Sequence, residues 1–388
     1  MRLTLAAFLF TLTAQAGAAA TCGGSFSSFV DGLKSEAATR GYDASTTERF
    51  FSSVSRSEDV LRADRAQGIF QKPFTDFART LISANRLQTG QAKGREWDGV
   101  FDRIENSYGV NRGVLLAIWA FETDFGGFQG NFNTANALVT LAHDCRRPEL
   151  FRPQVFAALE LYAQGSFDPA ATTGAWAGEI GMVQMLPGDI LAHGKDGDGD
   201  GRVSLKTSPA DALISGADLL AGFGWRPREP WLQEVTVPAS MDWSEAGIHT
   251  RKPAQQWAAL GVRARDGKLA NLPASLILPE GHRGPAFIAY PNFSIYFDWN
   301  QSFTYVLTAA YFATRLEGAP VFDARAPEPG LSGEQMKALQ RKLAQKGHDV
   351  GKIDGILGAG TRAAVRAEQV RLGLPADAWP TKVLLDRL

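Results

Sequence analysis

The sequence predicts a mainly α-helical protein with one large domain and one small C-terminal domain. Residues 25 to about 320 carry apolar residues at helical spacing, interrupted by Gly and Pro turns, with little sustained alternation. The Pro-rich, polar stretch VFDARAPEPG (321–330) is typical of a linker, and residues 331–388 follow as a compact segment. A chain of 388 residues, 45% of them hydrophobic, can bury a sizeable core and form more than one domain.

The first 20 residues have the pattern of a secretory signal peptide. One early Arg precedes an apolar run, and small residues ending in Ala18-Ala19-Ala20 form an A-x-A cleavage site. No second apolar run approaches membrane-spanning length. Cys22 could suggest a lipoprotein anchor, but the residue before it is Thr21 rather than Gly, Ala or Ser. We therefore expect a soluble, monomeric protein that is exported to the periplasm.

The net charge limits the classes of partner that we expect, and the cysteine content indicates whether a disulfide can form. The net charge of −1 gives no indication of nucleic acid or an anionic membrane as the main partner. Cys22 and Cys145 are the two cysteines, and in an oxidising compartment they favour one disulfide that ties the mature N-terminus to the body. Two free thiols are the alternative.

The clearest helix covers residues 110–127, VNRGVLLAIWAFETDFGG, and the two final glycines are expected to end it. Glu122 shares one stripe of this helix with Leu115, Ile118 and Phe125. Apolar surroundings raise a carboxyl pKa, and a protonated carboxyl is what general-acid catalysis on a glycosidic oxygen requires. A Glu at the rim of the stripe, paired with an Arg, is the alternative.

The segment KDGDGDGRVSLKTSPAD (195–211) begins like a calcium loop. Asp196, Asp198 and Asp200 occupy alternate positions and a glycine follows at position six, as in an EF-hand. The twelfth position, which an EF-hand fills with Glu, holds Thr207. Three interpretations remain at this point: a broken EF-hand, a flexible acidic turn, or a calcium site closed by another ligand.

Four blocks of the large domain identify a family resemblance. They are AIWAFETDFG around Glu122, GAWAGEIGMVQMLPGDI (174–190), GWRPREPWLQEVTVP (224–238) and FSIYFDWNQSFTYVLTAAYFATRL (293–316). In order and spacing they resemble the lytic murein transglycosylase B family, from about Phe26 to Leu316. The resemblance implies a lysozyme-like, mainly helical catalytic domain. It also implies non-hydrolytic cleavage of the β-1,4 bond from N-acetylmuramic acid to N-acetylglucosamine in peptidoglycan, leaving a 1,6-anhydro end.

That chemistry needs one carboxyl group, which the resemblance assigns to Glu122 as acid and then base. Ordinary glycosidases use two carboxyls, and no second candidate of equal quality is found. Asp124 faces away on the helix, Glu179 lies in a Gly-rich turn where a solvated side chain is expected, and Asp144 lies in a loop. The substrate 2-acetamido group can stabilise the cation-like centre. A hydrolytic muramidase of the goose-lysozyme type and a non-catalytic wall-binding protein remain as alternatives.

The resemblance also implies substrate contacts. Gln184 matches the Gln of the second block and is expected to hydrogen-bond the sugar near the scissile bond, and a polar residue at a helix start is the alternative. Asn300 and Tyr305 match the Asn and Tyr of the fourth block. Trp299 stands where the family more often has Tyr, so a phenolic hydrogen bond is absent at that position. Core packing is the alternative for the aromatic residues.

A second set of contacts concerns charge. Arg146 and Arg147 match a basic pair that can face the lactyl and peptide carboxylates of the substrate, and a solvated pair of charges is the alternative. Ala175 stands where some relatives have a Ser.

For the acidic loop, residues 196–211, the resemblance favours a structural Ca²⁺ site and no organic cofactor. The family closes its loop with an Asp slightly beyond the twelfth position. The implied ligands are the side chains of Asp196, Asp198, Asp200 and Asp211 and the backbone carbonyl of Arg202.

Residues 331–388 predict three helices. Ser332 and Gln335 form a capping-box signal, Gly347 is expected to stop the first helix, and the second is expected from about 361 to 372. The segment LQRKLAQKGHDVGKIDGILGAGTRAAVRAEQV resembles the peptidoglycan-binding domain type 1, which implies attachment to glycan strands. Glu368 departs from this pattern, because an aromatic residue usually precedes the Gln there. The first-helix residues expected in the core are Met336, Leu339 and Leu343.

Overall fold

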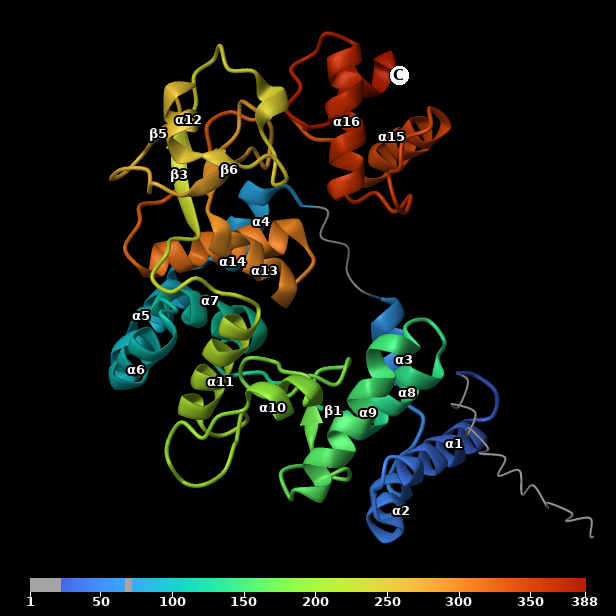
Figure 1. Cartoon of the computed structure of the whole chain (residues 1–388). Coiled ribbons are helices and arrows are strands. Elements are labelled where there is room, and N and C mark those ends of the chain that lie inside the picture. Colours follow the sequence, from blue (N-terminus) through green and yellow to red (C-terminus); the bar gives the residue numbers. More distant parts are fainter. Residues whose placement is uncertain (1–21, 67–71) are drawn as a thin grey trace, which may run out of the picture. The chain divides into compact units, whose positions relative to one another are not determined.

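The computed structural model describes residues 22–66 and 72–388, so the signal peptide prediction lies outside the described residues. The chain forms two compact units, Met1–Arg65 with Asn131–Glu179, and Ala66–Gly130 with Ile180–Leu388. The large domain is therefore built from alternating segments of the chain. The prediction of a mainly helical protein is confirmed (Figure 1).

The first unit is a small helical assembly in which α8 packs along α9 and α1 packs on α2. A short antiparallel pair joins Phe132 to Gly174 and Asn133 to Thr173. Asn133 also begins α8 as its N-cap, since its side-chain oxygen accepts a hydrogen bond from the backbone N–H of Asn136. The elements are α1 (Phe26–Thr39), α2 (Ala44–Ser52), α3 (Glu58–Arg65), β1 (Phe132–Asn133), α8 (Thr134–His143), α9 (Pro148–Ala163) and β2 (Thr173–Gly174).

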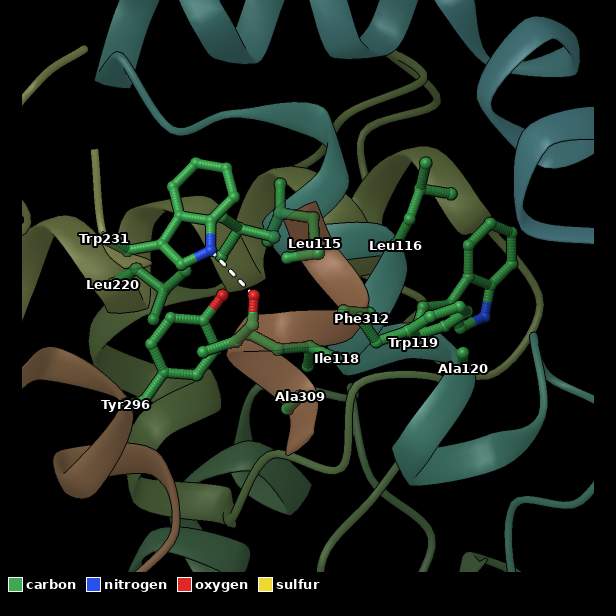
Figure 2. Close-up of a cluster of buried hydrophobic side chains, with 14 of the residues drawn as sticks. Leu115, Leu116, Ile118, Trp119, Ala120, Leu220, Trp231, Tyr296, Ala309 and Phe312 are labelled. Atoms are coloured by element: carbon green, nitrogen blue, oxygen red, sulfur yellow. Dashed lines mark hydrogen bonds between the residues drawn. The ribbon is translucent and has the colours of Figure 1, made fainter. Parts of the chain in front are cut away.

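The second unit is built around one central helix, α7 (Arg112–Thr123), which packs against α14 and also contacts α5, α6 and α11. Every residue from Gly113 to Ala120 is buried, as expected for a helix that other elements surround. Figure 2 shows Leu115, Ile118 and Trp119 of α7 among side chains of neighbouring elements. The surrounding helices are α4 (Phe74–Leu81), α5 (Ala84–Glu96), α6 (Asp98–Tyr108), α10 (Pro187–His193), α11 (Pro209–Gly222), α13 (Pro291–Trp299) and α14 (Phe303–Leu316).

Helix α7 ends earlier than the sequence predicted. Its last residue is Thr123, and Asp124, Phe125 and Gly126 follow with φ of 51°, 59° and 86°. Asp tolerates the left-handed conformation better than most residues, so Asp124 rather than a glycine becomes the cap. The chain then turns inward, and the buried ring of Phe125 packs edge-on against Trp119.

A five-stranded antiparallel sheet, which the sequence did not predict, lies in the second unit with strand order β4-β6-β7-β3-β5. Its central strands β6 and β7 are almost completely buried. Their sequences therefore show no alternation of apolar and polar residues. In register, Ile288 pairs with Gln233 on one side and Leu276 on the other. The elements are β3 (Leu232–Thr236), η1 (Trp243–Glu245), β4 (Lys252–Pro253), α12 (Ala254–Ala259), β5 (Arg263–Ala264), β6 (Pro273–Ile277) and β7 (Phe287–Ala289).

The C-terminal module has the three predicted helices, α15 (Gly333–Gln345), α16 (Ala359–Arg371) and α17 (Lys382–Arg387). Both halves of the Ser332–Gln335 capping box are present. The predicted core residues of α15 are buried. Glu368 is buried as well, and it is satisfied by His348 at 3.0 Å and Arg371 at 2.6 Å. A paired charge thus stands where the family pattern has an aromatic ring.

Residues 321–330 are held against the second unit along their length. Phe322 is buried in the main core, the carbonyl of Val321 accepts a hydrogen bond from Arg265, and that of Glu328 accepts one from Trp379 of the module.

The module itself contacts the sheet region through polar groups. Asp377 accepts hydrogen bonds from the backbone N–H of His282 at 3.0 Å and lies 2.6 Å from its Nδ1. The guanidinium of Arg362 donates to the carbonyl of Pro279 at 2.9 Å and lies over the ring of Phe303. Within residues 22–66 and 72–388, no helix combines the length and the apolar character needed to cross a membrane.

Candidate active site

The structure brings Glu122 and Tyr305 together. Glu122 is the penultimate residue of α7 and is half-buried. The hydroxyl of Tyr305, on α14, donates to the carbonyl of Phe121 at 3.1 Å and lies 3.4 Å from Oε1 of Glu122. Burial, together with the negative charge of Glu122, raises the pKa of Tyr305 well above its usual range. Tyr305 is therefore a neutral phenol that can donate a hydrogen bond to the carboxylate.

Aromatic rings line this region. The ring of Trp299 lies 5.4 Å from that of Tyr305, and the ring of Phe121 lies 5.5 Å from that of Tyr305. Phe121 also stacks on Phe312. Trp299 is partly exposed, so one face can meet a ligand while the other packs.

Asn300 has a local role between α13 and α14. Its side-chain oxygen accepts a hydrogen bond from the backbone N–H of Ser302 at 2.9 Å, and Ser302 is the N-cap of α14. The residue therefore shapes the turn that brings Trp299 and Tyr305 to the same place, and its oxygen is engaged in doing so.

Gln184 lies in a strained loop rather than at a helix start. Its φ is 51°, and α10 begins three residues later at Pro187. Its side-chain nitrogen donates to the carbonyl of Gly181 at 2.7 Å. A bridge between Ile180 and Met185 closes this loop.

Thr123, which sequence reasoning missed, connects the Gln184 loop to the end of the central helix. Its buried hydroxyl donates to the carbonyl of Met182 at 2.7 Å and accepts from the backbone N–H of Gly126 at 3.0 Å. One side chain thus links the residue after Glu122 to the residue two before Gln184. A hydroxyl beside the acid on an otherwise apolar helix was the signal available in the sequence.

Two other carboxylates, Asp124 and Glu179, lie in the segments that contain Glu122 and Gln184. Asp124 is exposed and pairs with Arg86 at 3.0 Å, which agrees with the prediction that it faces away from Glu122. The prediction of a solvated Glu179 is wrong. Its Oε2 atom is buried without a hydrogen-bond partner in the described part of the chain, and burial raises the pKa of its carboxyl, against the opposing effect of Arg147.

Arg146 and Arg147 lie in the first unit and share one buried carboxylate. Both guanidiniums donate through Nη2 to Oδ1 of Asp64, which is 1% exposed, and the Arg147 distance is 2.5 Å. Their side chains remain 41% and 34% exposed. The pair is therefore anchored at one edge and open to solvent at the other. Cys145, directly before it, forms a disulfide with Cys22.

In the acidic loop, carboxylate oxygens of Asp196, Asp198 and Asp211 lie within 4.8 Å of one another. Asp211, in the first turn of α11, is fully buried and accepts hydrogen bonds from the backbone N–H groups of Gly197 at 2.8 Å and Ser204 at 2.7 Å. It therefore holds the two sides of the loop together.

Two further predicted ligands lie beside this group. Asp200 accepts a hydrogen bond from the backbone N–H of Arg202, and both residues line a cavity of about 390 Å³ with Asp198 and Thr207. Asp196 and Asp211 do not line this cavity, so Asp198 is the residue that the cavity and the carboxylate group share. The grouped carboxylate oxygens of Asp196, Asp198 and Asp211 are ligands that suit a hard cation such as Ca²⁺. The hydrogen bond from the Gly201 N–H lowers the pKa of Asp196, which keeps that carboxylate charged.

Comparison with known proteins shows two matching family models. Residues 25–314 match the model of the transglycosylase SLT domain, and residues 332–388 match that of the putative peptidoglycan binding domain. A curated relative, membrane-bound lytic murein transglycosylase B of Escherichia coli K12, is 25% identical over 280 residues, which cover 69% of this chain and 76% of that protein.

Two solved structures have a fold similar to that of this chain. SltB3 from Pseudomonas aeruginosa, crystallised with NAG-anhNAM-pentapeptide, is 38% identical with a TM-score of 0.86, over 94% of this chain and 99% of that one. The E. coli lytic transglycosylase Slt35 in complex with calcium has the same fold, with a TM-score of 0.66 and 23% identity, over 79% of this chain and 98% of that one.

Proposed function

Because the chain belongs to the transglycosylase SLT domain family, we propose that it is a lytic transglycosylase that cleaves the N-acetylmuramic acid–N-acetylglucosamine bond of peptidoglycan without water. The product is a 1,6-anhydromuramic end. The observation that carries the proposal is the Glu122–Tyr305 contact, with a neutral phenol directed at a single carboxyl group. The E. coli relative is named a lytic murein transglycosylase. SltB3 was crystallised in complex with NAG-anhNAM-pentapeptide, which contains an anhydro sugar.

In this mechanism Glu122 acts twice. As an acid it gives its proton to the glycosidic oxygen while the bond to C1 of the muramic residue breaks. As a carboxylate it then takes the proton of the C6 hydroxyl, whose oxygen forms the new bond to C1. The Tyr305 hydroxyl, 3.4 Å away, favours the carboxylate form that exists between the two steps. The substrate acetamido group stabilises the positive charge at C1, so a second protein carboxylate is not required.

Substrate contacts follow from the same assignment. Gln184 hydrogen-bonds the sugar near the scissile bond through its side-chain oxygen, because its side-chain nitrogen donates to the carbonyls of Gly181 and Gln129. Trp299 offers a ring face on which a sugar can stack. Asn300 acts through the turn it shapes. Arg146 and Arg147 receive carboxylates of the stem peptide through the exposed parts of their guanidiniums.

A bound Ca²⁺ would have a structural role. Asp196, Asp198, Asp200, Asp211 and the carbonyl of Arg202 would supply its oxygen ligands, and the ion would cancel the repulsion among the aspartates. The loop shape is supported by the hydrogen bonds to Asp211.

The C-terminal module binds peptidoglycan in this proposal and brings the enzyme to the wall. The protein acts in the periplasm as a monomer, where an oxidising environment suits the Cys22–Cys145 disulfide.

Mass spectrometry of digests tests the proposal. Wild-type protein should release muropeptides with 1,6-anhydro ends, and Glu122→Gln should release none while still binding isolated peptidoglycan. Asp124→Asn, a matched change two residues along the chain, should retain activity because Asp124 is exposed and paired with Arg86. Reducing ends from the wild-type protein would instead indicate a goose-type hydrolase. Unchanged lysis by Glu122→Gln would exclude Glu122 as the catalytic acid.

A further inference from the structure

Residues 144–147 of the first unit are held from several sides. Asp144 pairs with Arg65 at 2.6 Å, and Cys145 is bonded to Cys22. Arg146 and Arg147 both meet Asp64, the neighbour of Arg65 at the end of α3. Asp64, which lies 82 positions before Arg146 and 83 before Arg147, and its neighbour Arg65 therefore hold this segment in place.

The backbone adds a constraint. Cys145 has a φ of 57°, a conformation that residues other than glycine adopt rarely and that persists only when neighbouring contacts hold it. The N-terminal segment supplies such contacts, because the N–H of Gly23 donates to the carbonyl of His143 at 2.9 Å. The ring of His143 meets Phe26 and Phe29 edge-on. The disulfide thus joins an anchored N-terminal segment to the residue before the arginine pair.

The charges of this cluster leave it with the character of an anion site. Two guanidiniums share the single charge of Asp64, so the pair keeps a surplus positive charge. In the described part of the chain, the side chains of Arg146 and Arg147 form hydrogen bonds through Nη2, and the ring of Phe151 lies 5.1 Å from the Arg147 guanidinium. Donors on the exposed side remain for a planar carboxylate, the group that a guanidinium binds best.

We propose that Asp64 and the Cys22–Cys145 disulfide are positioning elements that hold Arg146 and Arg147 as a preformed site for stem-peptide carboxylates. The proposal rests on the role given to the arginine pair above and adds the groups that make the pair rigid. Without Asp64 the two like charges repel and both side chains become mobile. Binding must then order two long side chains, which weakens it by on the order of tenfold.

The test compares two substrates in the full-length protein. One is glycan carrying stem peptides with free carboxylates, and the other is the same glycan with those carboxylates converted to amides. Wild-type protein should have a KM about tenfold lower for the acid form. Asp64→Asn should lose that preference through KM, with kcat within about twofold. Cys22→Ser should lose part of it, on the order of threefold, because the Asp64 contacts remain.

Matched controls separate positioning from stability. Asp59→Asn removes an exposed carboxylate of the same helix, α3, and should keep the preference. The Arg146→Ala/Arg147→Ala double variant should lose the preference, and adding Asp64→Asn to it should change nothing further, since residues that act as one unit are not additive. Binding of a muramoyl pentapeptide, measured by calorimetry on the Glu122→Gln background, gives the same comparison without turnover.

Two results would overturn the proposal. One is an Asp64→Asn protein that keeps the preference for the acid substrate. The other is an equal loss on acid and amide substrates, which would show a general role in folding. Failure of the proposed function is visible separately, as wild-type digests without anhydro ends or as an arginine double variant that keeps the preference.

Discussion

Replacing Thr123 by Val removes the hydroxyl that joins the Gln184 loop to the end of α7 and keeps the shape of the side chain. The carbonyl of Met182, which accepts at 2.7 Å, and the N–H of Gly126, which donates at 3.0 Å, both lose this partner. Since Thr123 and Met182 are buried, water replaces the lost bond poorly at the carbonyl.

The size of the effect follows from two opposing quantities. An unsatisfied buried polar group costs about 1–3 kcal/mol. The additional methyl of Val returns about 0.8 kcal/mol of apolar burial. The free energy of unfolding should therefore fall by up to about 2 kcal/mol, which corresponds to a decrease in Tm of up to about 8 °C at about 2–4 °C per kcal/mol. Loss of position at Gln184 should reduce kcat/KM by about 10–100-fold, because a displacement near 1 Å can cost that much.

Thermal melts and turnover of isolated glycan strands measure both effects. Thr123→Ser is the control, because it keeps the hydroxyl and loses one methyl, and its kcat/KM should stay within a few-fold of wild type. A Val variant with wild-type Tm and wild-type turnover would refute the reasoning, and a Val variant that is less stable but fully active would restrict Thr123 to a structural role.

Three further outcomes are expected. Millimolar calcium should raise Tm and a chelator should reverse the rise, by up to about 2.7 kcal/mol of stability at 100 times Kd, and Asp211→Asn should abolish the calcium response; no shift in the wild-type protein would count against the site. Tyr305→Phe should lower kcat about tenfold with little change in KM, because the phenol contacts Glu122 rather than supplying a charge; unchanged kcat would remove it from the mechanism. The hydrogen bond from Arg371 lowers the pKa of Glu368 below its ordinary value near 4.5, against the effect of burial, so this carboxylate stabilises the fold above about pH 4.5 and the contribution is lost as the pH falls through its lowered pKa. The Tm difference between wild type and Glu368→Gln should therefore shrink on acidification from pH 6.5 to 3, and a constant difference would contradict the assignment.

Features coded by neighbouring residues were predictable. The central helix, the Ser332 capping box and the three helices of the module follow from spacing and cap residues within one segment. The helix stop after Glu122 was misplaced, because the inward packing of Phe125 decided it rather than the glycines.

Features that join distant segments were not predictable from local patterns. The sheet is made of strands of two to five residues, and its buried strands show no alternation. The Thr123 contact spans 59 residues and the Asp64–Arg146 contact spans 82, so neither leaves a signal in its own neighbourhood. Glu179 was misjudged for the same reason, since its Gly-rich flanks indicate a turn but not what covers the turn.

The contacts of the C-terminal module have a mechanical consequence. A wall-binding module on a flexible tether would only raise the local concentration of the catalytic unit, without favouring one glycan strand within reach over another. The hydrogen bonds of Asp377 with His282, of Arg362 with Pro279 and of Trp379 with Glu328 instead tie the module to the unit that contains Glu122. If the module binds a glycan strand and Glu122 cleaves it, as proposed above, these contacts would limit the distance along the strand between the bound part and the bond that is cut.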